Sequence, residues 1–175
     1  SEMCIRDSSK YEDRLITHIE ANPRFIQPEA RRNEIMGVLK AGLKDISISR
    51  SSVEWGIPLP FDSSQNIYVW VEALCNYITA LDYYEHGDLY RKFWPANVHM
   101  MAKEIIRFHV IIWPAMLMAV EHPLPERIFA HGWMTKDGEK ISKTTGNVID
   151  IDGLIDDFGL DPFRYFFMRE FSFGS

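Results

Sequence analysis

The sequence predicts an α/β fold in which helices cover both faces of a parallel sheet. Two observations carry this prediction: strand-like and helix-like segments alternate through the middle of the chain, and 46% of the 175 residues are hydrophobic. That content is enough for a sizeable core. Strands that alternate with helices form parallel sheets, because each parallel connection needs a crossover. Ligands of such sheets bind beyond the carboxyl ends of the strands.

The N-terminal part is expected to be mainly helical. Apolar side chains recur at helical spacing over 10–21, which predicts a first helix. A second helix is expected over 28–42, from a proline suited to the first helical turn to a glycine that ends helices. Residues 46–50 alternate between apolar and polar and predict a short strand, whereas Gly and Pro make 55–60 a rigid loop.

The central part supplies the predicted sheet, whose strands are expected at 67–70, 98–102 and 128–134. One helix is expected directly after the first strand, and another is expected over 103–120. A polar loop follows over 136–147. The remainder is expected to be helical, and Asp161 with Pro162 has the cap and first-turn pattern of a helix start.

Charge and cysteine content exclude several classes of protein. The formal net charge of −6 argues against a protein that coats nucleic acid, although a local phosphate site needs only a few positioned groups. Cys4 and Cys75 lie in no C-x-x-C pattern, so we expect no zinc site and a reduced, cytoplasmic setting. The longest apolar stretch, 108–120, is too short to span a membrane, so no membrane partner is expected. Residues 1–8 fit no periodic element and are treated as a candidate non-native scar.

The loop over 137–147 carries the clearest chemistry. Lys140 and Lys143 lie three residues apart, beside small hydroxyl residues and between Gly138 and Gly146. Two ammonium groups on a closing loop can follow the negative charge that develops on a pyrophosphate leaving group. The glycines let the loop close and its backbone approach a nucleotide. A solvated, lysine-containing turn is the alternative that this pattern alone leaves open.

Two helical stripes are candidates for a shared pocket. Trp70, Ala73 and Tyr77 share one helix face by their spacing, and so do His109 and Trp113. Taken alone, this spacing favours ordinary core for both stripes, because a single histidine on an apolar helix is usually a satisfied core residue.

Five blocks in series resemble the methionyl-tRNA synthetases, a family of class I aminoacyl-tRNA synthetases. The blocks are LKDISISRSSVEWGIPLP (43–60), IYVWVEALCNYITAL (67–81), NVHMMAKEIIRFHVIIWPAMLMA (97–119), HGWMTKDGEKISKTTGN (131–147) and GLDPFRYFFMREFSFGS (159–175). In the fourth block, KISKT stands where the family has its KMSKS loop. The resemblance covers about residues 9–175. It implies that the chain forms the second half of the family's Rossmann-like, doubly wound catalytic domain.

The resemblance also implies a division of the chain. Residues 9–45 match the helical end of the family's connective region, and 46–150 match the second half of the catalytic domain, with its lysine loop at 140–144. Residues 151–175 match the start of the helical segment that follows. The family's HIGH motif and the zinc-binding connective insert do not occur in these 175 residues. We therefore expect this chain to be a partial, inactive fragment with poor solubility.

Candidate site residues follow from the same resemblance. The positions that match the surroundings of methionine are Arg50, Trp70, Ala73, Tyr77, His109 and Trp113. Arg50 would face the carboxylate, with a surface salt bridge as its alternative role. The positions that match the ATP site are Ala102, Glu104, Lys140, Ser142, Lys143, Asn147 and Val148. The chain departs from the commonest family pattern where Ala102 replaces Gly and where Glu72 and Glu104 replace Asp.

The implied activity is ATP-dependent activation of methionine to methionyl-adenylate, followed by transfer to tRNA. Methionine, ATP and tRNA are the implied partners, Mg²⁺ enters with ATP, and Lys140 and Lys143 are the implied catalytic residues. Two alternatives stay open. One is another class I synthetase, such as the cysteine, leucine or valine enzyme, and the other is a non-catalytic relative that keeps the fold as a binding module.

Overall fold

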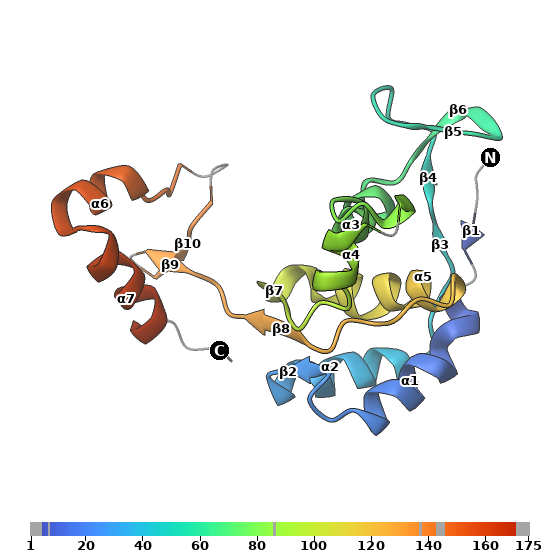
Figure 1. Ribbon diagram of the computed structural model, residues 1–175, viewed down its shortest axis with the longest axis horizontal. Helices are drawn as coiled ribbons and strands as arrows, with labels where there is room; N and C mark the ends of the chain where they lie inside the picture. The colour runs from blue at the N-terminus through green and yellow to red at the C-terminus, as the bar shows by residue number, and fades with distance from the viewer. Residues whose placement is uncertain (1–4, 7, 86, 137, 143–145, 171–175) are drawn as a thin grey trace.

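A computed structural model describes residues 5–6, 8–85, 87–136, 138–142 and 146–170 (Figure 1). Its helices are η1 (Ser8–Tyr11), α1 (Glu12–Ala21), α2 (Glu29–Lys40), α3 (Val69–Thr79), η2 (Tyr83–Glu85), α4 (Asp88–Phe93), η3 (Lys103–Ile105), the π-helix η4 (Phe108–Ile112), α5 (Trp113–Ala119), α6 (Ile151–Phe158) and α7 (Leu160–Glu170). Its strands are β1 (Ile5–Arg6), β2 (Ile26–Gln27), β3 (Ile46–Ser47), β4 (Ser49–Arg50), β5 (Pro58–Leu59), β6 (Asp62–Ile67), β7 (His99–Ala102), β8 (Ile128–His131), β9 (Thr135–Lys136) and β10 (Glu139–Lys140).

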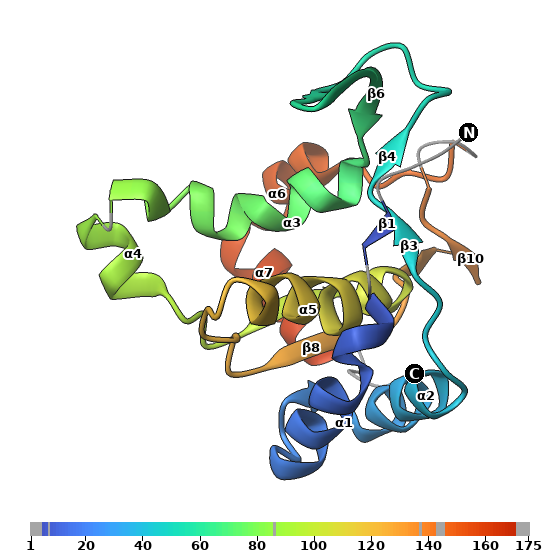
Figure 2. The same cartoon turned by 90° about the vertical axis from the view of Figure 1, so that its right-hand side faces the viewer.

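A parallel sheet of order β2-β8-β7 forms the centre of the molecule. Strands β7 and β8 pair in parallel from His99↔Ile128 to Ala102↔His131, and the segment from η3 to α5 connects them. This arrangement confirms the predicted strand–helix–strand unit over 98–134. In both views α3 lies on one side of the layer formed by β8 and α5, and α1 and α2 lie on the other (Figures 1 and 2).

The predicted strand at 67–70 is wrong. Strand β6 ends at Ile67 and pairs antiparallel with β4 and β5, outside the parallel sheet. Tyr68 is extended and directly precedes α3, which begins at Val69. The aromatic and β-branched side chains of this stretch favour a strand locally. The helix forms instead because it buries Leu74 and Ile78, one turn apart, against α5.

The third parallel strand was not predicted. It is β2, whose two residues lie between the first two helices and pair with Ile128 and Phe129 of β8. Both Phe25 and Ile26 are buried here, because the chain passes through the core between α1 and α2. Two residues are too few for a period-2 pattern, so no sequence signal marks this strand.

Smaller differences between prediction and structure concern the boundaries of strands and helices. The predicted strand at 46–50 is two short strands with different partners, and the predicted loop at 55–60 contains β5. The polar loop at 136–147 opens with the β9–β10 hairpin. Two helices follow it, and the second already begins at Leu160, so Asp161 is not its cap. The side chain that caps a helix in this region is Asp150, which accepts a hydrogen bond from the Gly153 N–H at the start of α6.

The core divides into two clusters. The first cluster packs α1 and α2 against the sheet and one face of the 103–119 segment, and its largest members are Leu15, Ile19, Phe25, Ile35 and Leu39. The second cluster, which we call the aromatic cluster, packs α3 against the other face of that segment, with Leu74, Ile78, Trp94, Trp113 and Leu117 at its centre. The segment over 103–119 is therefore fixed from both sides.

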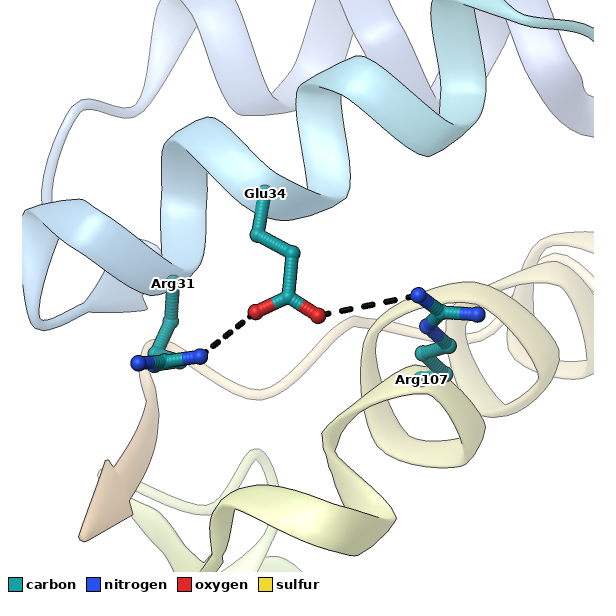
Figure 3. A network of polar contacts seen from close by, with 3 residues as sticks. All are labelled: Arg31, Glu34 and Arg107. Carbon is teal, nitrogen blue, oxygen red and sulfur yellow. Dashed lines mark hydrogen bonds and ion pairs between the residues drawn. The ribbon is translucent and has the colours of Figure 1, made fainter. Parts of the chain in front are cut away.

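A polar bridge on the surface joins α2 to the beginning of the π-helix (Figure 3). Glu34 accepts from Arg31 at 2.6 Å within α2, and its other oxygen lies 3.7 Å from Arg107, the residue before η4. These side chains are partly or largely exposed, so each pair contributes about 0–1 kcal/mol. The bridge adds little to stability beside the buried core.

Candidate active site

The predicted pocket residues gather where α3 crosses the π-helix and α5 above strand β7. Tyr77 comes from α3, His109 from the π-helix and Trp113 from the first position of α5. The ring centroids of Tyr77 and His109 are 5.6 Å apart, and those of Tyr77 and Trp113 are 6.1 Å apart. Two helices that are separate in sequence therefore bring these three predicted side chains together.

A π-helix forms at this point because Pro114 interrupts the ordinary helical pattern. The Trp113 N–H donates to the Phe108 carbonyl, five residues back, and Pro114 has no N–H to donate. Single π-turns of this kind occur frequently at functional sites. Here the turn carries His109, which is 3% exposed.

His109 is held by hydrogen bonds at both ring nitrogens. Its Nδ1 lies 3.0 Å from the Ile105 carbonyl oxygen, and its Nε2 lies 2.9 Å from the Tyr77 hydroxyl. A carbonyl can only accept, so Nδ1 carries the proton. In the neutral ring Nε2 is then an acceptor, and the Tyr77 hydroxyl donates to it. The pair has one defined arrangement of protons.

Trp70 and Ala73 complete the face of α3 that holds Tyr77. The Trp70 ring stacks on Phe108, with centroids 4.0 Å apart and planes at 9°, and lies edge-on to His109 at 6.0 Å. Ala73 lies between Trp70 and Tyr77 in sequence on this face of the helix and is exposed. The four aromatic positions predicted from the sequence are thus in contact or near contact.

Three further aromatic residues contact the predicted side chains and were not among the residues selected from the sequence. His99, the first residue of β7, accepts a hydrogen bond from the Trp113 indole N–H at 3.2 Å. Phe108 stacks on Trp70, and Trp94 lies edge-on to Trp113 at 5.9 Å. Of these three residues, only Phe108 could have been suspected from the sequence, because it directly precedes His109. His99 and Trp94 reach the site through the tertiary fold.

Burial keeps the polar groups of the site uncharged. Burial lowers the pKa of His109, and the Ile105 carbonyl opposes that shift by stabilising the protonated ring. Burial, with His109 nearby, lowers the pKa of His99 to about 4. Burial also raises the pKa of Tyr77 above its ordinary value. At neutral pH the site is therefore an aromatic surface with neutral imidazoles and a neutral phenol.

Arg50 lies at the edge of this region, on β4. Its Nη1 donates to the carbonyls of Ser47 and Ser49 at 3.1 and 2.8 Å, and its guanidinium stands 3.8 Å from the centre of the Tyr68 ring. Tyr68 directly precedes α3, so Arg50 sits beside the start of the helix that carries Trp70. Its side chain is anchored on the backbone and on an aromatic face.

The predicted nucleotide residues begin at the carboxyl edge of the sheet. Ala102 is the last residue of β7 and pairs with His131, the last residue of β8. Glu104 follows in the first turn after β7 and is exposed. The loop with the two lysines follows β8 at the same edge, where parallel sheets bind ligands.

The base of that loop is closed by backbone pairing. The Ser142 N–H donates to the Asn147 carbonyl at 2.9 Å, and the Val148 N–H donates to Gly146 at 3.0 Å. Lys140 pairs through its backbone with Thr135. Lys143, which lies between Ser142 and Asn147 in sequence, is outside the described residues.

Comparison with known proteins identifies the family. The model of the family described as tRNA synthetases class I (M) matches residues 2–175. The chain belongs to this family. Its relatives include the methionine–tRNA ligase of Clostridium acetobutylicum, 57% identical over 169 residues, and that of Rickettsia conorii, 54% identical over 167 residues. Each alignment covers 95% of this chain, but 26% and 33% of the respective relatives. The chain thus spans about a quarter to a third of the length of these synthetases.

Solved structures of methionyl-tRNA synthetases share the fold. The Mycobacterium tuberculosis enzyme bound by methionyl-adenylate matches with a TM-score of 0.92 and 43% identity, over 99% of this chain and 34% of that one. The apo form of the same enzyme matches with a TM-score of 0.85 at 43% identity, over 98% of this chain and 33% of that one. The predicted fold class, the second half of a class I synthetase catalytic domain, is confirmed.

No cluster of three or more His, Cys, Asp or Glu side chains within the described part of the chain could hold a metal ion. Likewise, none of the helices in the described ranges is long and apolar enough to cross a membrane.

Proposed function

We propose that this chain supplies the methionine pocket and the lysine loop of a methionine–tRNA ligase. The observation that carries the proposal is the Tyr77–His109 hydrogen bond at 2.9 Å, set among the rings of Trp70 and Trp113. The matching part of the Mycobacterium tuberculosis synthetase belongs to a structure that contains methionyl-adenylate. Family membership and local geometry thus support the same assignment.

The chemistry of the pocket suits the methionine side chain. Methionine is uncharged, flexible and polarizable, and its sulfur makes favourable contacts with the edges of aromatic rings. Trp70 and Trp113 offer such rings, while the Tyr77–His109 pair is the polar feature near them. Because burial keeps both partners neutral, no charge has to be desolvated when an apolar side chain enters.

Arg50 is the proposed contact for the methionine carboxylate. A guanidinium has five N–H donors in a fixed fork. The two bonds from Nη1 to Ser47 and Ser49 hold the group in place and leave donors for a carboxylate. This anchoring fits a fixed recognition role better than a mobile surface salt bridge does.

The proposed reaction has two steps. A carboxylate oxygen of methionine attacks the α-phosphorus of ATP, and the bond from that phosphorus to the β-phosphate oxygen breaks, releasing pyrophosphate. A ribose hydroxyl of the terminal adenosine of tRNA then attacks the carbonyl carbon of methionyl-adenylate and AMP leaves. Mg²⁺ enters as part of the ATP substrate. The cytoplasm is the proposed compartment.

The nucleotide is assigned to the carboxyl edge of β7 and β8. We place the ribose near Ala102 and Glu104 and the adenine near Asn147 and Val148. The methyl group of Ala102 brings side-chain bulk to a position where the family often has Gly. Ser142, Lys140 and Lys143 would face the phosphates, and Lys143 is the main candidate for stabilising the leaving pyrophosphate.

The test uses a complete enzyme, because the relatives are three to four times longer than this chain. In the Clostridium acetobutylicum methionine–tRNA ligase, the matching segment is replaced by this chain, and we call the product the chimeric ligase. We expect ATP–pyrophosphate exchange that depends on methionine. Leucine, valine and cysteine at equal concentration serve as controls and should give no exchange. A folded chimeric ligase without methionine-dependent exchange would favour a non-catalytic relative and refute the proposal.

A further inference from the structure

His99 lies against the aromatic cluster, in contact with Trp94 and Trp113, although none of the pocket predictions included it. It is 5% exposed and begins strand β7, where its backbone N–H donates to the Arg127 carbonyl at 2.8 Å. Its ring centroid is 4.1 Å from Tyr77, 6.0 Å from Trp94 and 6.3 Å from His109. One imidazole on a sheet strand therefore lies close to residues from both helices of the pocket.

The hydrogen bond from Trp113 defines the state of this imidazole. Trp113 is 1% exposed, and its indole N–H is a donor only, so it needs an acceptor inside the protein. The acceptor is Nε2 of His99 at 3.2 Å. A neutral His99 that accepts at Nε2 carries its proton on Nδ1. Burial, which holds the pKa of His99 at about 4, keeps the ring in this accepting state at neutral pH.

Two walls of the pocket depend on His99. The hydrogen bond favours one orientation of the buried Trp113 ring, because that orientation gives the indole N–H an acceptor. The tilted contact with His99, at 33° between planes, supports one face of the Tyr77 ring. Tyr77 is 37% exposed, so its ring is packed only in part, and the contact with His99 helps to keep its hydroxyl within reach of His109.

We propose that His99 is a positioning residue for methionine selection, acting through Trp113 and Tyr77 rather than by touching the amino acid. The inference rests on the proposed function. Strand β7 supplies the rigid support, because it is paired along its whole length with β8. In a site whose shape must match one side chain, the residues that contact the ligand need rigid neighbours that hold them in place.

The test compares variants of the chimeric ligase that separate the ring of His99 from its acceptor atom. His99→Phe keeps a ring beneath Tyr77 but removes the acceptor. His99→Gln keeps an acceptor near the position of Nε2. We expect His99→Phe to raise KM for methionine roughly tenfold, because a buried N–H loses its partner, while kcat and KM for ATP change less than twofold. His99→Gln should restore most of the methionine affinity.

Two comparisons distinguish positioning from general stability. In a double-mutant cycle, adding His99→Phe to Trp113→Phe should cost less than His99→Phe costs alone, because the donor is already gone. His18→Phe is the matched control. His18 is a part-buried histidine on α1, edge-on to Phe25 at 4.6 Å in the other core cluster, and its substitution should leave KM for methionine unchanged.

Each outcome decides the proposal. Unchanged KM for methionine in His99→Phe overturns it. So does an equal loss for methionine and ATP in both His99 variants. If His99→Phe does not fold, ¹⁵N NMR of the unsubstituted chimeric ligase with labelled histidine decides, because a proton on Nε2 of His99 is incompatible with the proposed bond. Failure of the proposed function is recognised separately, as absent methionine-dependent exchange in the unsubstituted chimeric ligase.

Discussion

At the scale of single residues, the site is a chain of hydrogen bonds with fixed direction. The Ile105 carbonyl sets the tautomer of His109, and that tautomer makes Nε2 the acceptor for Tyr77. Helical spacing alone suggested that Tyr77 and His109 each lie on a defined face. It could not show that the two faces meet, because that depends on how α3 crosses the π-helix. His99 was beyond sequence reasoning for the same reason.

The proposed role of Lys143 predicts a specific kinetic defect when this lysine is removed. In the chimeric ligase, Lys143→Ala should lower the rate of adenylate formation by roughly 10²–10³, as the loss of one positioned donor does in other enzymes. Methionine affinity should stay nearly unchanged, because charge grows on pyrophosphate only as the bond breaks. Quench-flow at saturating methionine and ATP separates the rate from binding.

Controls for the lysine prediction come from the same loop. Lys136→Ala removes an exposed lysine from β9 and should leave the rate within about twofold, as expected of a surface site. Lys140→Ala should have a smaller effect than Lys143→Ala. An unchanged rate in Lys143→Ala, with a raised methionine dissociation constant instead, would contradict the catalytic assignment.

Buried His99 predicts how stability depends on pH. The pKa is 6.5 in an ordinary environment and about 4 in the folded chain, so the unfolded chain binds the proton more readily. Stability from the neutral ring is therefore complete above pH 6.5 and is lost as pH falls toward 4. Between pH 7 and 4.5 the chain should lose about 2–3 kcal/mol more than His99→Phe does. Urea unfolding at both pH values measures this difference, and equal losses would show that His99 is not buried neutral.

At the scale of elements, the segments with long helical periodicity were predicted well. The helices over 12–21, 29–40 and 103–119 and the strands β7 and β8 lie close to the predicted positions. The elements that were not predicted correctly are short, or their conformation depends on tertiary packing. Strand β2 has two residues, and the first residues of α3 have strand-like side chains whose preference helix packing overrides. The π-turn was also invisible in the sequence, although Pro114 marks where the helix changes.

Two glycines give opposite predictions for helix stability. Gly159 separates α6 from α7 with φ of +87°, a conformation that side chains with a Cβ avoid. Gly159→Ala should therefore cost about 1–3 kcal/mol. Gly37 lies exposed within α2, where an added Cβ meets no atom within 4 Å. Gly37→Ala should stabilise the chain by about 0.5–1 kcal/mol.

Urea unfolding of both variants, followed by circular dichroism, measures these two free energies. The pair controls for the general effect of adding a methyl group. Stabilisation by Gly159→Ala would mean that the junction between α6 and α7 has a different backbone conformation. Destabilisation by Gly37→Ala would mean that the exposed face of α2 is covered.

At the scale of the whole molecule, the sheet and the two core clusters fix the positions of the proposed methionine pocket and of the lysine loop. The 103–119 segment packs on both clusters. We therefore expect substitutions on the face toward the first cluster to affect mainly stability, and substitutions on the face toward the aromatic cluster to affect the proposed pocket. The lysine loop follows β8 at the carboxyl edge of the sheet, the edge at which parallel sheets bind ligands. In Figure 1, α6 and α7 stand apart from the helices that build the pocket.

Binding of both ligands to one pocket variant tests whether this pocket holds methionine. Equilibrium dissociation constants for methionine and for ATP are compared between the chimeric ligase and its His109→Ala form. Loss of this buried ring should weaken methionine binding by at most about 3–5 kcal/mol, by analogy with core truncations. The affinity for ATP should change less than twofold. A His109→Ala enzyme with altered ATP affinity and unchanged methionine affinity would contradict the assignment of this pocket to methionine.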